Sequence, residues 1–234
     1  MVLMRSPSFH TQGLDLHVRT TIDSYYSYIE SAAVKIGNHI LEVVSKDKII
    51  LDGVEMDAPT SGSIPIPNDV DGETYLYESM LLSNKKAIYR LHMGSAEIHF
   101  KFFAHFLTIN VMGGKGDFGD SVGLMGNHTD GSMWDREGKA FQGTFEDYGF
   151  EWQVNPLAGD AQLFHDKDRS PQLPYEKCRV PTAARPSRRK LRGNDANLFE
   201  KAQAACQAVA NQGDVDLCID DVLTTGELGL AEVW

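Results

Sequence analysis

Residues 97–112 read Glu97-Ile-His-Phe-Lys-Phe-Phe-Ala-His-Phe-Leu-Thr-Ile-Asn-Val-Met112 and form the strongest β-strand pattern in the chain. Apolar side chains recur at alternate positions, which is the period of a strand that buries one face. Because an ordinary strand rarely exceeds about 10 residues, the stretch predicts a pair of strands or one long bent strand. One face of it is predicted to carry Ile98, Phe100, Phe102, Ala104, Phe106, Thr108 and Asn110.

Further strand patterns lie on the N-terminal side of this stretch. They occupy residues 14–22, 25–36, 39–45, 49–51, 54–56, 75–80 and 87–92. Gly37-Asn38 and Asp52-Gly53 are two-residue turn signals between them. Because many short strands follow one another with no helix between them, the sequence predicts a mainly β fold, an antiparallel β-sandwich or open barrel.

The composition is that of a folded globular protein. The chain of 234 residues is 42% hydrophobic and 24% charged. Its formal net charge of −11 argues against general nucleic-acid binding and suits cation binding or plain solubility. No apolar run approaches the roughly 20 residues of a membrane helix, so no membrane insertion is expected. The N-terminus lacks the apolar core of a signal peptide, which predicts either a protein that is not secreted or a fragment of a longer chain.

Changes in composition divide the chain into parts. Residues 145–154 are rich in aromatic side chains and predict a closing strand that docks Phe150 and Trp152. Residues 156–193 contain several prolines and a basic run at 185–192, which predict a linker. The predicted organisation is a disordered lead (1–13), a β domain (14–155), a Pro/Arg-rich linker (156–193) and a helical hairpin segment (194–234).

The last part is predicted to form a small α-helical segment. One helix begins at Asn194 or Asp195 and continues to about Asn211. A second helix covers residues 215–225, and a glycine follows each of the two. The apolar stripe of the first helix consists of Leu198, Ala202, Ala205, Cys206 and Val209.

The three cysteines of the chain all lie in its last quarter, and none belongs to a Cys-x-x-Cys pair, which argues against a zinc site. Cys206 and Cys218 fall on the two adjacent predicted helices. A disulfide between them would staple the hairpin and contribute about 2–3 kcal/mol in an oxidising compartment. The alternative is two buried free thiols. Cys178 is left to pair outside this chain or to replace one of the other two as a partner.

The glycine-rich loop, residues 119–138, combines five glycines with acidic and amide side chains. Side-chain oxygens within nine residues come from Asn127, Asp130 and Asp135, and backbone carbonyls could be added by His128 and Trp134. Calcium takes about six to eight oxygen ligands, so a cation site is one hypothesis, although the spacing is not that of an EF-hand. Asn and Asp also form turns on their own, and spacing alone favours that alternative.

Several of these motifs, taken together, resemble the C-terminal half of a von Willebrand factor type D domain. They are Val122-Gly-Leu-Met-Gly-Asn127, then Asp130 and Asp135, then Tyr148-Gly-Phe-Glu-Trp152. Leu51-Asp52-Gly53 also resembles a turn of that family. The likeness covers residues 14–154, and residues 205–226 resemble the C8-like, cysteine-bearing helical segment that often follows such domains.

The chain departs from the family pattern in two respects. Val122 and Met125 occupy the two positions where the family usually carries cysteines, so the disulfides of the vertebrate version are absent. The family's opening strand, with its Gly-Asp-Pro-His and Phe-Asp-Gly motifs, is missing. The resemblance therefore implies an N-terminally truncated domain that has lost one acidic ligand and the Asp-Pro bond that some relatives cleave.

The resemblance implies a structural Ca2+ ion in the glycine-rich loop. Asn127 and Asp135 are its expected ligands in particular, and the middle ligand is Asp130 or Thr129. The carbonyls of His128 and Trp134 would complete the shell. Asn127 also begins the glycosylation sequon Asn-His-Thr, which is predicted to be unmodified because a coordinating amide cannot also carry a glycan.

The function that the resemblance implies is that of a non-enzymatic, extracellular or secreted module for adhesion, matrix contact or assembly. Its partners would be other extracellular or matrix proteins, or further domains of the same parent protein. Two alternatives stay open. One is a secreted, carbohydrate-active β-sandwich enzyme that uses the acidic side chains of Asp117, Asp120, Glu146 and Asp147, and the other is a lipid-carrying module. A concave pocket lined by converging polar groups would favour the enzyme.

Overall fold

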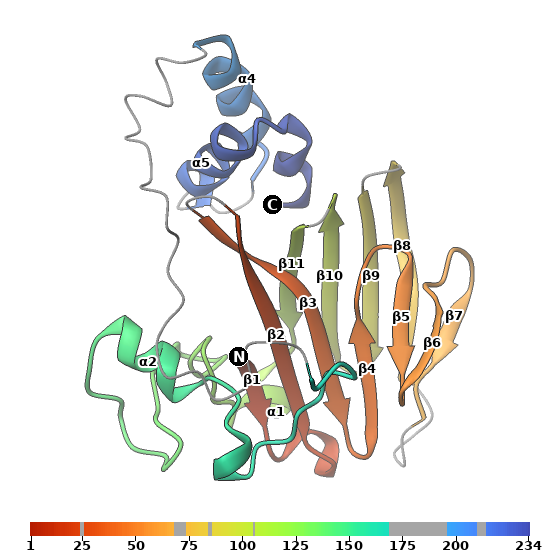
Figure 1. Cartoon of the computed structure of the whole chain (residues 1–234), viewed down its shortest axis with the longest axis vertical. Coiled ribbons are helices and arrows are strands. Elements are labelled where there is room, and N and C mark those ends of the chain that lie inside the picture. Colours follow the sequence, from red (N-terminus) through yellow and green to blue (C-terminus); the bar gives the residue numbers. More distant parts are fainter. Residues whose placement is uncertain (24–25, 68–73, 84–85, 105, 169–195, 210–213) are drawn as a thin grey trace.

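The computed structural model describes residues 1–23, 26–67, 74–83, 86–104, 106–168, 196–209 and 214–234. Within these ranges, eleven strands form one antiparallel sheet that curls into a half-barrel, and a group of helices lies near the C-terminus (Figure 1). The predicted mainly β fold with a small helical C-terminal segment is therefore confirmed.

Most strands of the sheet pair with their neighbours in sequence. The strand order is β6-β5-β4-β3-β11-β10-β9-β8-β7, and β2 joins β1 to β3 away from this path. The pairing of β3 with β11 connects the two halves of the sheet through Ile29 and Leu107. The strands are β1 (Val2–Ser6), β2 (Leu14–Asp23), β3 (Tyr26–Ile36), β4 (His39–Val43), β5 (Lys48–Leu51), β6 (Val54–Asp57), β7 (Ser63–Pro65), β8 (Thr74–Ser83), β9 (Lys86–Met93), β10 (Ala96–Phe103) and β11 (Phe106–Met112).

Residues 97–112 form two strands, β10 and β11, rather than one bent strand. The turn between them gives Ala104 a positive φ of 52° and places Phe102 opposite Leu107. This register moves the buried face of β11 to Leu107, Ile109 and Val111, which pack on the main core. The prediction that Phe106, Thr108 and Asn110 share the face of Phe102 is wrong, because Phe106 pairs with Phe103 and this register decides which positions face inward.

The main hydrophobic core joins the two halves of the curled sheet. It takes inward-facing side chains from both, including Leu16, Val34, Leu41, Ile49, Leu76, Tyr89, Leu91, Ile98 and Phe100. Each of these side chains is almost fully removed from solvent. Burial of one large aliphatic or aromatic side chain contributes about 1.5–3 kcal/mol, so this cluster supplies most of the favourable free energy of the fold.

The N-terminal residues, predicted to be a disordered lead, are ordered. Strand β1 pairs with β2, and its Val2 and Met4 side chains are fully buried. The short helix η1 (Phe9–Thr11) follows and buries Phe9 against Phe118 of helix α1 (Lys115–Phe118). A five-residue strand gives a weak local signal, and its order depends on partners that are distant in sequence.

Residues 145–154 do not form the predicted closing strand. Residues 145–151 form helix α2 (Phe145–Glu151) instead. Thr144 caps this helix: its Oγ1 accepts from the Asp147 backbone N–H at 3.1 Å, and the Asp147 carboxylate accepts from the Thr144 N–H at 2.9 Å. This reciprocal capping box fixes the start of the helix. Tyr148 and Trp152, four residues apart, are both buried in a small separate cluster with Val2 and Val154.

A segment that we call the strap, residues 152–164, crosses the outer face of the sheet after α2. It contains the short helix η2 (Pro156–Ala158) and ends with Leu163 and Phe164, which pack on Ala33 and Ile40. The first part of the predicted 156–193 linker is therefore docked on the sheet. The basic run at 185–192 and Cys178 lie outside the described residues.

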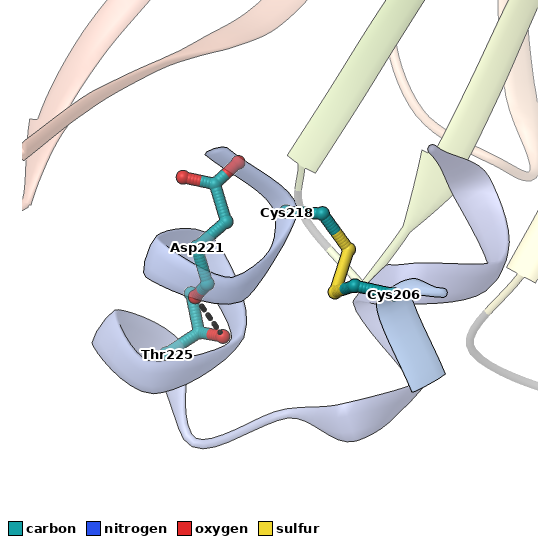
Figure 2. The surroundings of a disulfide bond; sticks show 4 residues. All are labelled: Cys206, Cys218, Asp221 and Thr225. Carbon is teal, nitrogen blue, oxygen red and sulfur yellow. Dashed lines mark hydrogen bonds between the residues drawn. A yellow bond between two sulfur atoms is a disulfide. The ribbon is translucent and has the colours of Figure 1, made fainter. Parts of the chain in front are cut away.

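The C-terminal helices form a compact unit at one end of the sheet (Figure 1). Helices α4 (Ala196–Cys206) and α5 (Val215–Thr225) and helix η4 (Leu228–Val233) share a cluster of buried side chains with Phe103 of β10. A disulfide joins Cys206 to Cys218 across a Cα–Cα distance of 5.9 Å (Figure 2), as the sequence pattern favoured. Among the described residues, no helix is long and apolar enough to cross a membrane.

Candidate functional site

The glycine-rich loop is fastened to strand β1 by backbone hydrogen bonds. Arg5 and Val122 exchange two of them, at 2.7 and 2.9 Å, and Leu124 N–H donates to the Val2 carbonyl at 3.1 Å. Met125 N–H donates to the Leu3 carbonyl at 3.1 Å. The stretch that carries the family resemblance therefore acts as an added edge for β1 and links it to the rest of the loop.

Gly123 is the position where this close approach requires glycine. Its φ is 134°, and a Cβ atom there would lie 2.6 Å from the Leu3 carbonyl oxygen and 2.9 Å from Met4 Cα. Both neighbours are backbone atoms, so neither can move without shifting β1. The Gly123 carbonyl also accepts a hydrogen bond from Tyr148 Oη at 2.7 Å, which joins the loop to helix α2.

We expect Gly123→Ala to destabilise the fold by at least about 2 kcal/mol, because a strained backbone conformation costs about 1–3 kcal/mol and the backbone clash adds to it. The matched control is Gly131→Ala, where φ is 70° and no atom lies within 4 Å of an added Cβ. Chemical unfolding of both variants checks the difference. Equal losses at the two positions would show that the contact with β1 does not matter.

Asn127 is held deep in the loop by both ends of its amide. The side chain is only 9% exposed, and Nδ2 donates to the carbonyls of Gly119 and Ser121, each at 3.0 Å. Its Oδ1 accepts the Thr129 N–H at 2.9 Å and the Thr129 hydroxyl. The predicted calcium ligand is thus the centre of a turn, and its oxygen already has two donors.

The other predicted ligands are also engaged within their own turns. Asp130 Oδ1 accepts from Ser132 N–H at 2.9 Å, and Asp135 Oδ1 accepts from Lys139 N–H at 2.8 Å. The Ser132 hydrogen bonds lower the pKa of Asp130. The Trp134 carbonyl accepts from the indole N–H of Trp152 at 3.1 Å, and the His128 ring lies 3.3 Å from the Gly113 carbonyl.

The predicted cation ligands make hydrogen bonds within the loop itself. In the part of the chain that the structure covers, no three His, Cys, Asp or Glu side chains gather closely enough to hold a metal ion. The hydrogen bonds of Asn127, Asp130 and Asp135 are those of the turn-forming alternative. In this arrangement the side-chain oxygens of Asn127, Asp130 and Asp135 accept hydrogen bonds within the loop, and the proposed function does not depend on a bound ion. Calcium binding itself stays a prediction of the resemblance.

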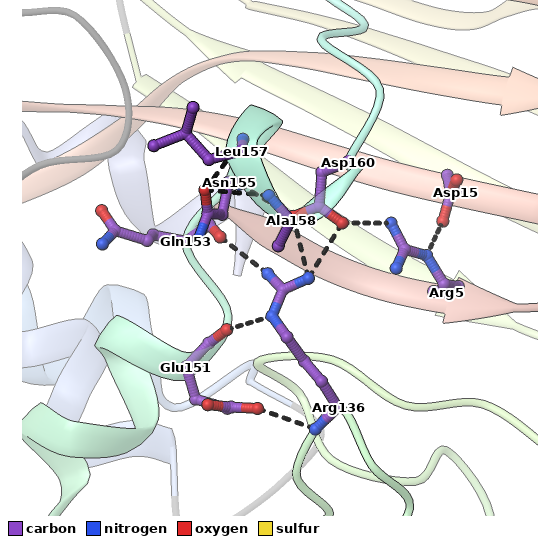
Figure 3. Close-up of polar contacts among 9 residues, drawn as sticks. All are labelled: Arg5, Asp15, Arg136, Glu151, Gln153, Asn155, Leu157, Ala158 and Asp160. Atoms are coloured by element: carbon purple, nitrogen blue, oxygen red, sulfur yellow. Dashed lines mark hydrogen bonds and ion pairs between the residues drawn. The ribbon is translucent and has the colours of Figure 1, made fainter.

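Arg136, which the sequence analysis did not single out, organises the far side of the loop (Figure 3). Its Nε donates to the Glu151 carbonyl at 2.6 Å and its Nη2 to the Gln153 carbonyl at 2.7 Å. Its guanidinium also lies over the Trp152 ring, 5.2 Å from the centroid, and its Nη1 donates to Asp160 at 2.9 Å. One side chain therefore holds the loop, the end of α2 and the strap together.

Asp160 is the buried counter-charge of this arrangement, with a side chain that is 4% exposed. It accepts from Asn155 N–H at 2.8 Å and pairs with Arg5 at 3.2 Å, while Arg5 also pairs with Asp15 (Figure 3). Burial pushes the pKa of Asp160 upward, but the hydrogen bonds from Arg136 and Asn155 outweigh it and lower that pKa below its ordinary value. The carboxylate stays charged because two guanidinium groups hold it.

The acidic side chains that the enzyme alternative would use also have structural partners. Asp117 accepts from Gly114 N–H at 2.7 Å, and Asp120 accepts from Ser8 N–H at 2.8 Å. Burial raises the pKa of each, but these hydrogen bonds and those from serine hydroxyls lower it overall. The pKa of Asp147 is lowered by its hydrogen bonds with Thr144. A general acid needs a raised pKa, and these three carboxyls have lowered ones.

A separate cavity of about 340 Å³ lies between the end of the strap and the outer face of β4 and β5. Ile40, Ile50 and Phe164 provide apolar walls, and the Glu42 carboxylate accepts from His165 N–H at 2.8 Å. No residue of the glycine-rich loop lines it. The acidic loop and this cavity are therefore distinct features.

No protein-family model matches this chain, and no curated protein matches it either. The function must therefore be argued from the residues of this chain and their contacts.

Proposed function

We propose that this chain is a non-enzymatic module of an extracellular protein, related in plan to a von Willebrand factor type D domain, which serves adhesion, matrix contact or assembly. The observation that carries the proposal is the disulfide between Cys206 and Cys218, whose side chains are fully buried. Disulfides persist in oxidising compartments and are rare in the reducing cytosol. The helical hairpin that this bond staples packs on the β-domain through Phe103.

The glycine-rich loop supports the same proposal. The segment that resembles the type D motif, residues 122–127, fastens β1 and contacts helix α2 through Gly123 and Tyr148. Asp117, Asp120 and Asp147 serve as hydrogen-bond acceptors for backbone and hydroxyl groups, and their lowered pKa values suit this structural work. A loop whose carboxylates hold backbone and hydroxyl groups in this way suits a binding module.

The test is a disulfide map of the natural protein together with its location. Intact cells are treated with a membrane-impermeant thiol reagent, and the cells and the medium are then separated. The protein from each fraction is alkylated, digested without reduction and analysed by mass spectrometry.

The proposal expects the protein in the medium or at the cell surface, with the peptides of Cys206 and Cys218 linked. Reduction before alkylation is the control that must separate the two peptides. A protein that remains in the cytosol with both cysteines alkylated would overturn the proposal.

A further inference from the structure

His17 of strand β2 is fully buried beneath the strap. Its cross-strand partners are Val2 on one side and Ala33 on the other. Val2 packs with Trp152 and Val154, from the beginning of the strap, and Ala33 packs with Leu163 and Phe164, from its end. The imidazole therefore lies on the strip of sheet that the strap covers, and its exposed fraction is 0%.

The His17 imidazole has no hydrogen-bond partner at either ring nitrogen. A buried polar group without a partner costs about 1–3 kcal/mol even when it is neutral. Protonation would add a positive charge and a second N–H donor to the imidazole. While the strap is in place, neither N–H group would have an acceptor. The closed structure is therefore compatible with the neutral ring only.

The charged groups around His17 come from every element packed on it. Met1 contributes its α-amino group, strand β1 contributes Arg5, the loop contributes Arg136, and the strap contributes Asp160. On the same face of the sheet, Asp15 and Arg19 flank His17 on β2, and Lys35 lies two residues from Ala33 on β3. Glu42 of β4 lies opposite Ala33, and its carboxylate accepts from His165 N–H at 2.8 Å. The carboxylate that acts on His17, that of Asp160, is already shared by two guanidinium groups.

We propose that His17 is the trigger of an acid-sensitive strap: its protonation releases residues 152–164 from the outer face of the sheet. Opening admits water to the imidazolium, so the charged ring favours the open arrangement. Opening also uncovers Val2, Ala33 and the Trp152 indole, which gives the module a second surface at low pH.

The direction of the effect follows from the pKa of His17, which burial, the Met1 ammonium and Arg5 lower from 6.5 to about 3. A group whose pKa is lowered in the closed state stabilises that state fully above its ordinary pKa, and this stabilisation is lost as the pH falls toward the lowered value. The α-amino group of Met1, with a pKa lowered to about 5, acts in the same direction at higher pH.

The contributions of His17 and of the Met1 α-amino group to strap opening can be distinguished between pH 5 and pH 4. Between these values His17 favours opening by roughly tenfold, whereas the Met1 ammonium adds a factor of about 2. Hydrogen exchange of the 152–164 peptide, corrected for the intrinsic rate at each pH, measures this opening. Amides of β9 and β10 report global unfolding in the same spectra.

Three proteins are compared. The unmodified chain is expected to lose roughly twentyfold of strap protection between pH 5 and pH 4, the product of the two factors, and His17→Phe about twofold. His165→Gln, which removes an exposed histidine just after the strap, should behave like the unmodified chain. An undiminished loss in His17→Phe, or full strap protection at pH 4 in the unmodified chain, would overturn the proposal.

If His17→Phe fails to fold, the protonation of His17 can be measured directly in the unmodified chain. Carbon-13 NMR of histidine rings follows its protonation in the unmodified chain. The proposal expects His17 to protonate only as the strap loses protection. An ordinary titration of His17 near pH 6.5 with the strap still protected would contradict it.

Discussion

Replacing Arg136 by Met is expected to lower the free energy of unfolding by about 3 kcal/mol. The side chain donates to two backbone carbonyls and to Asp160, whose own side chain is 4% exposed. Removing one member of a buried ion pair costs about 3–5 kcal/mol, because it leaves an uncompensated charge. Arg5 still contacts Asp160 at 3.2 Å, which places the loss at the lower end of that range.

Chemical unfolding measures this loss, and Lys139→Met is its matched control. Lys139 pairs with Glu137 at the surface, where both side chains are 72% exposed, and such pairs contribute about 0–1 kcal/mol. The double variant with Asp160→Asn should recover part of the loss, since it removes a buried charge that has lost one of its two guanidinium partners. Equal effects of the Arg136 and Lys139 substitutions would contradict the role given to Arg136.

Replacing Trp152 by Ala is expected to cost about 3–5 kcal/mol, the largest loss from a single side chain near the loop. The indole is 1% exposed, and it packs with Val2, Tyr148 and Val154. Its N–H donates to the Trp134 carbonyl at 3.1 Å, so truncation leaves both a cavity and an unsatisfied acceptor. A domain is stable by only about 5–15 kcal/mol, so this variant should unfold at a clearly lower denaturant concentration.

Two further variants serve as controls for Trp152→Ala. Phe145→Ala, at the start of α2, removes an aromatic ring that is 86% exposed and should change stability by less than about 0.5 kcal/mol. Trp152→Phe keeps most of the apolar volume but loses the indole N–H, and should fall between the two. A Trp152→Ala loss no larger than that of Phe145→Ala would show that the loop and α2 do not depend on this contact.

Much of the fold could be predicted from the sequence because the strands of the curled sheet pair mainly with sequence neighbours. Alternation along residues 97–112 and the turn at Asp52-Gly53 are local signals, and the structure contains both hairpins. The helices near Cys206 and Cys218 have clear apolar stripes, and Gly226 ends the second as expected. The first ends at Cys206, short of the predicted end at about Asn211. For these elements, the residues that decide the structure lie within a few positions of one another.

The errors arose where local patterns competed or where partners were distant. Tyr148, Phe150 and Trp152 alternate as in a strand, but Thr144 and Asp147 have capping-box spacing, and the helix prevailed. Strand β1 is held by a loop more than a hundred residues away. Arg136 and Asp160 gave no signal, because a lone Arg and a lone Asp are common surface residues until the fold buries them.

How the glycine-rich loop uses its side chains could not be predicted in detail from the sequence. Asn127, Asp130 and Asp135 could bind a cation or form turns, and the sequence pattern allows both. The hydrogen bonds of these side chains are those of turns. The loop is held in place by backbone hydrogen bonds to β1, by the hydrogen bond from Tyr148 and by the contacts of Arg136. The loop is therefore a clamp held by its own hydrogen bonds.

Hydrogen exchange of the loop in the presence of EDTA tests this claim most directly. The amides of Val122, Leu124, Met125 and Asn127, each bonded to a backbone carbonyl, should be protected as strongly as those of β2 and β3. Added calcium at about 2 mM should raise this protection only modestly, since extracellular calcium modules bind with dissociation constants of about 10⁻⁴–10⁻³ M. Fast exchange of the four amides in EDTA, with protection appearing only when calcium is added, would contradict it.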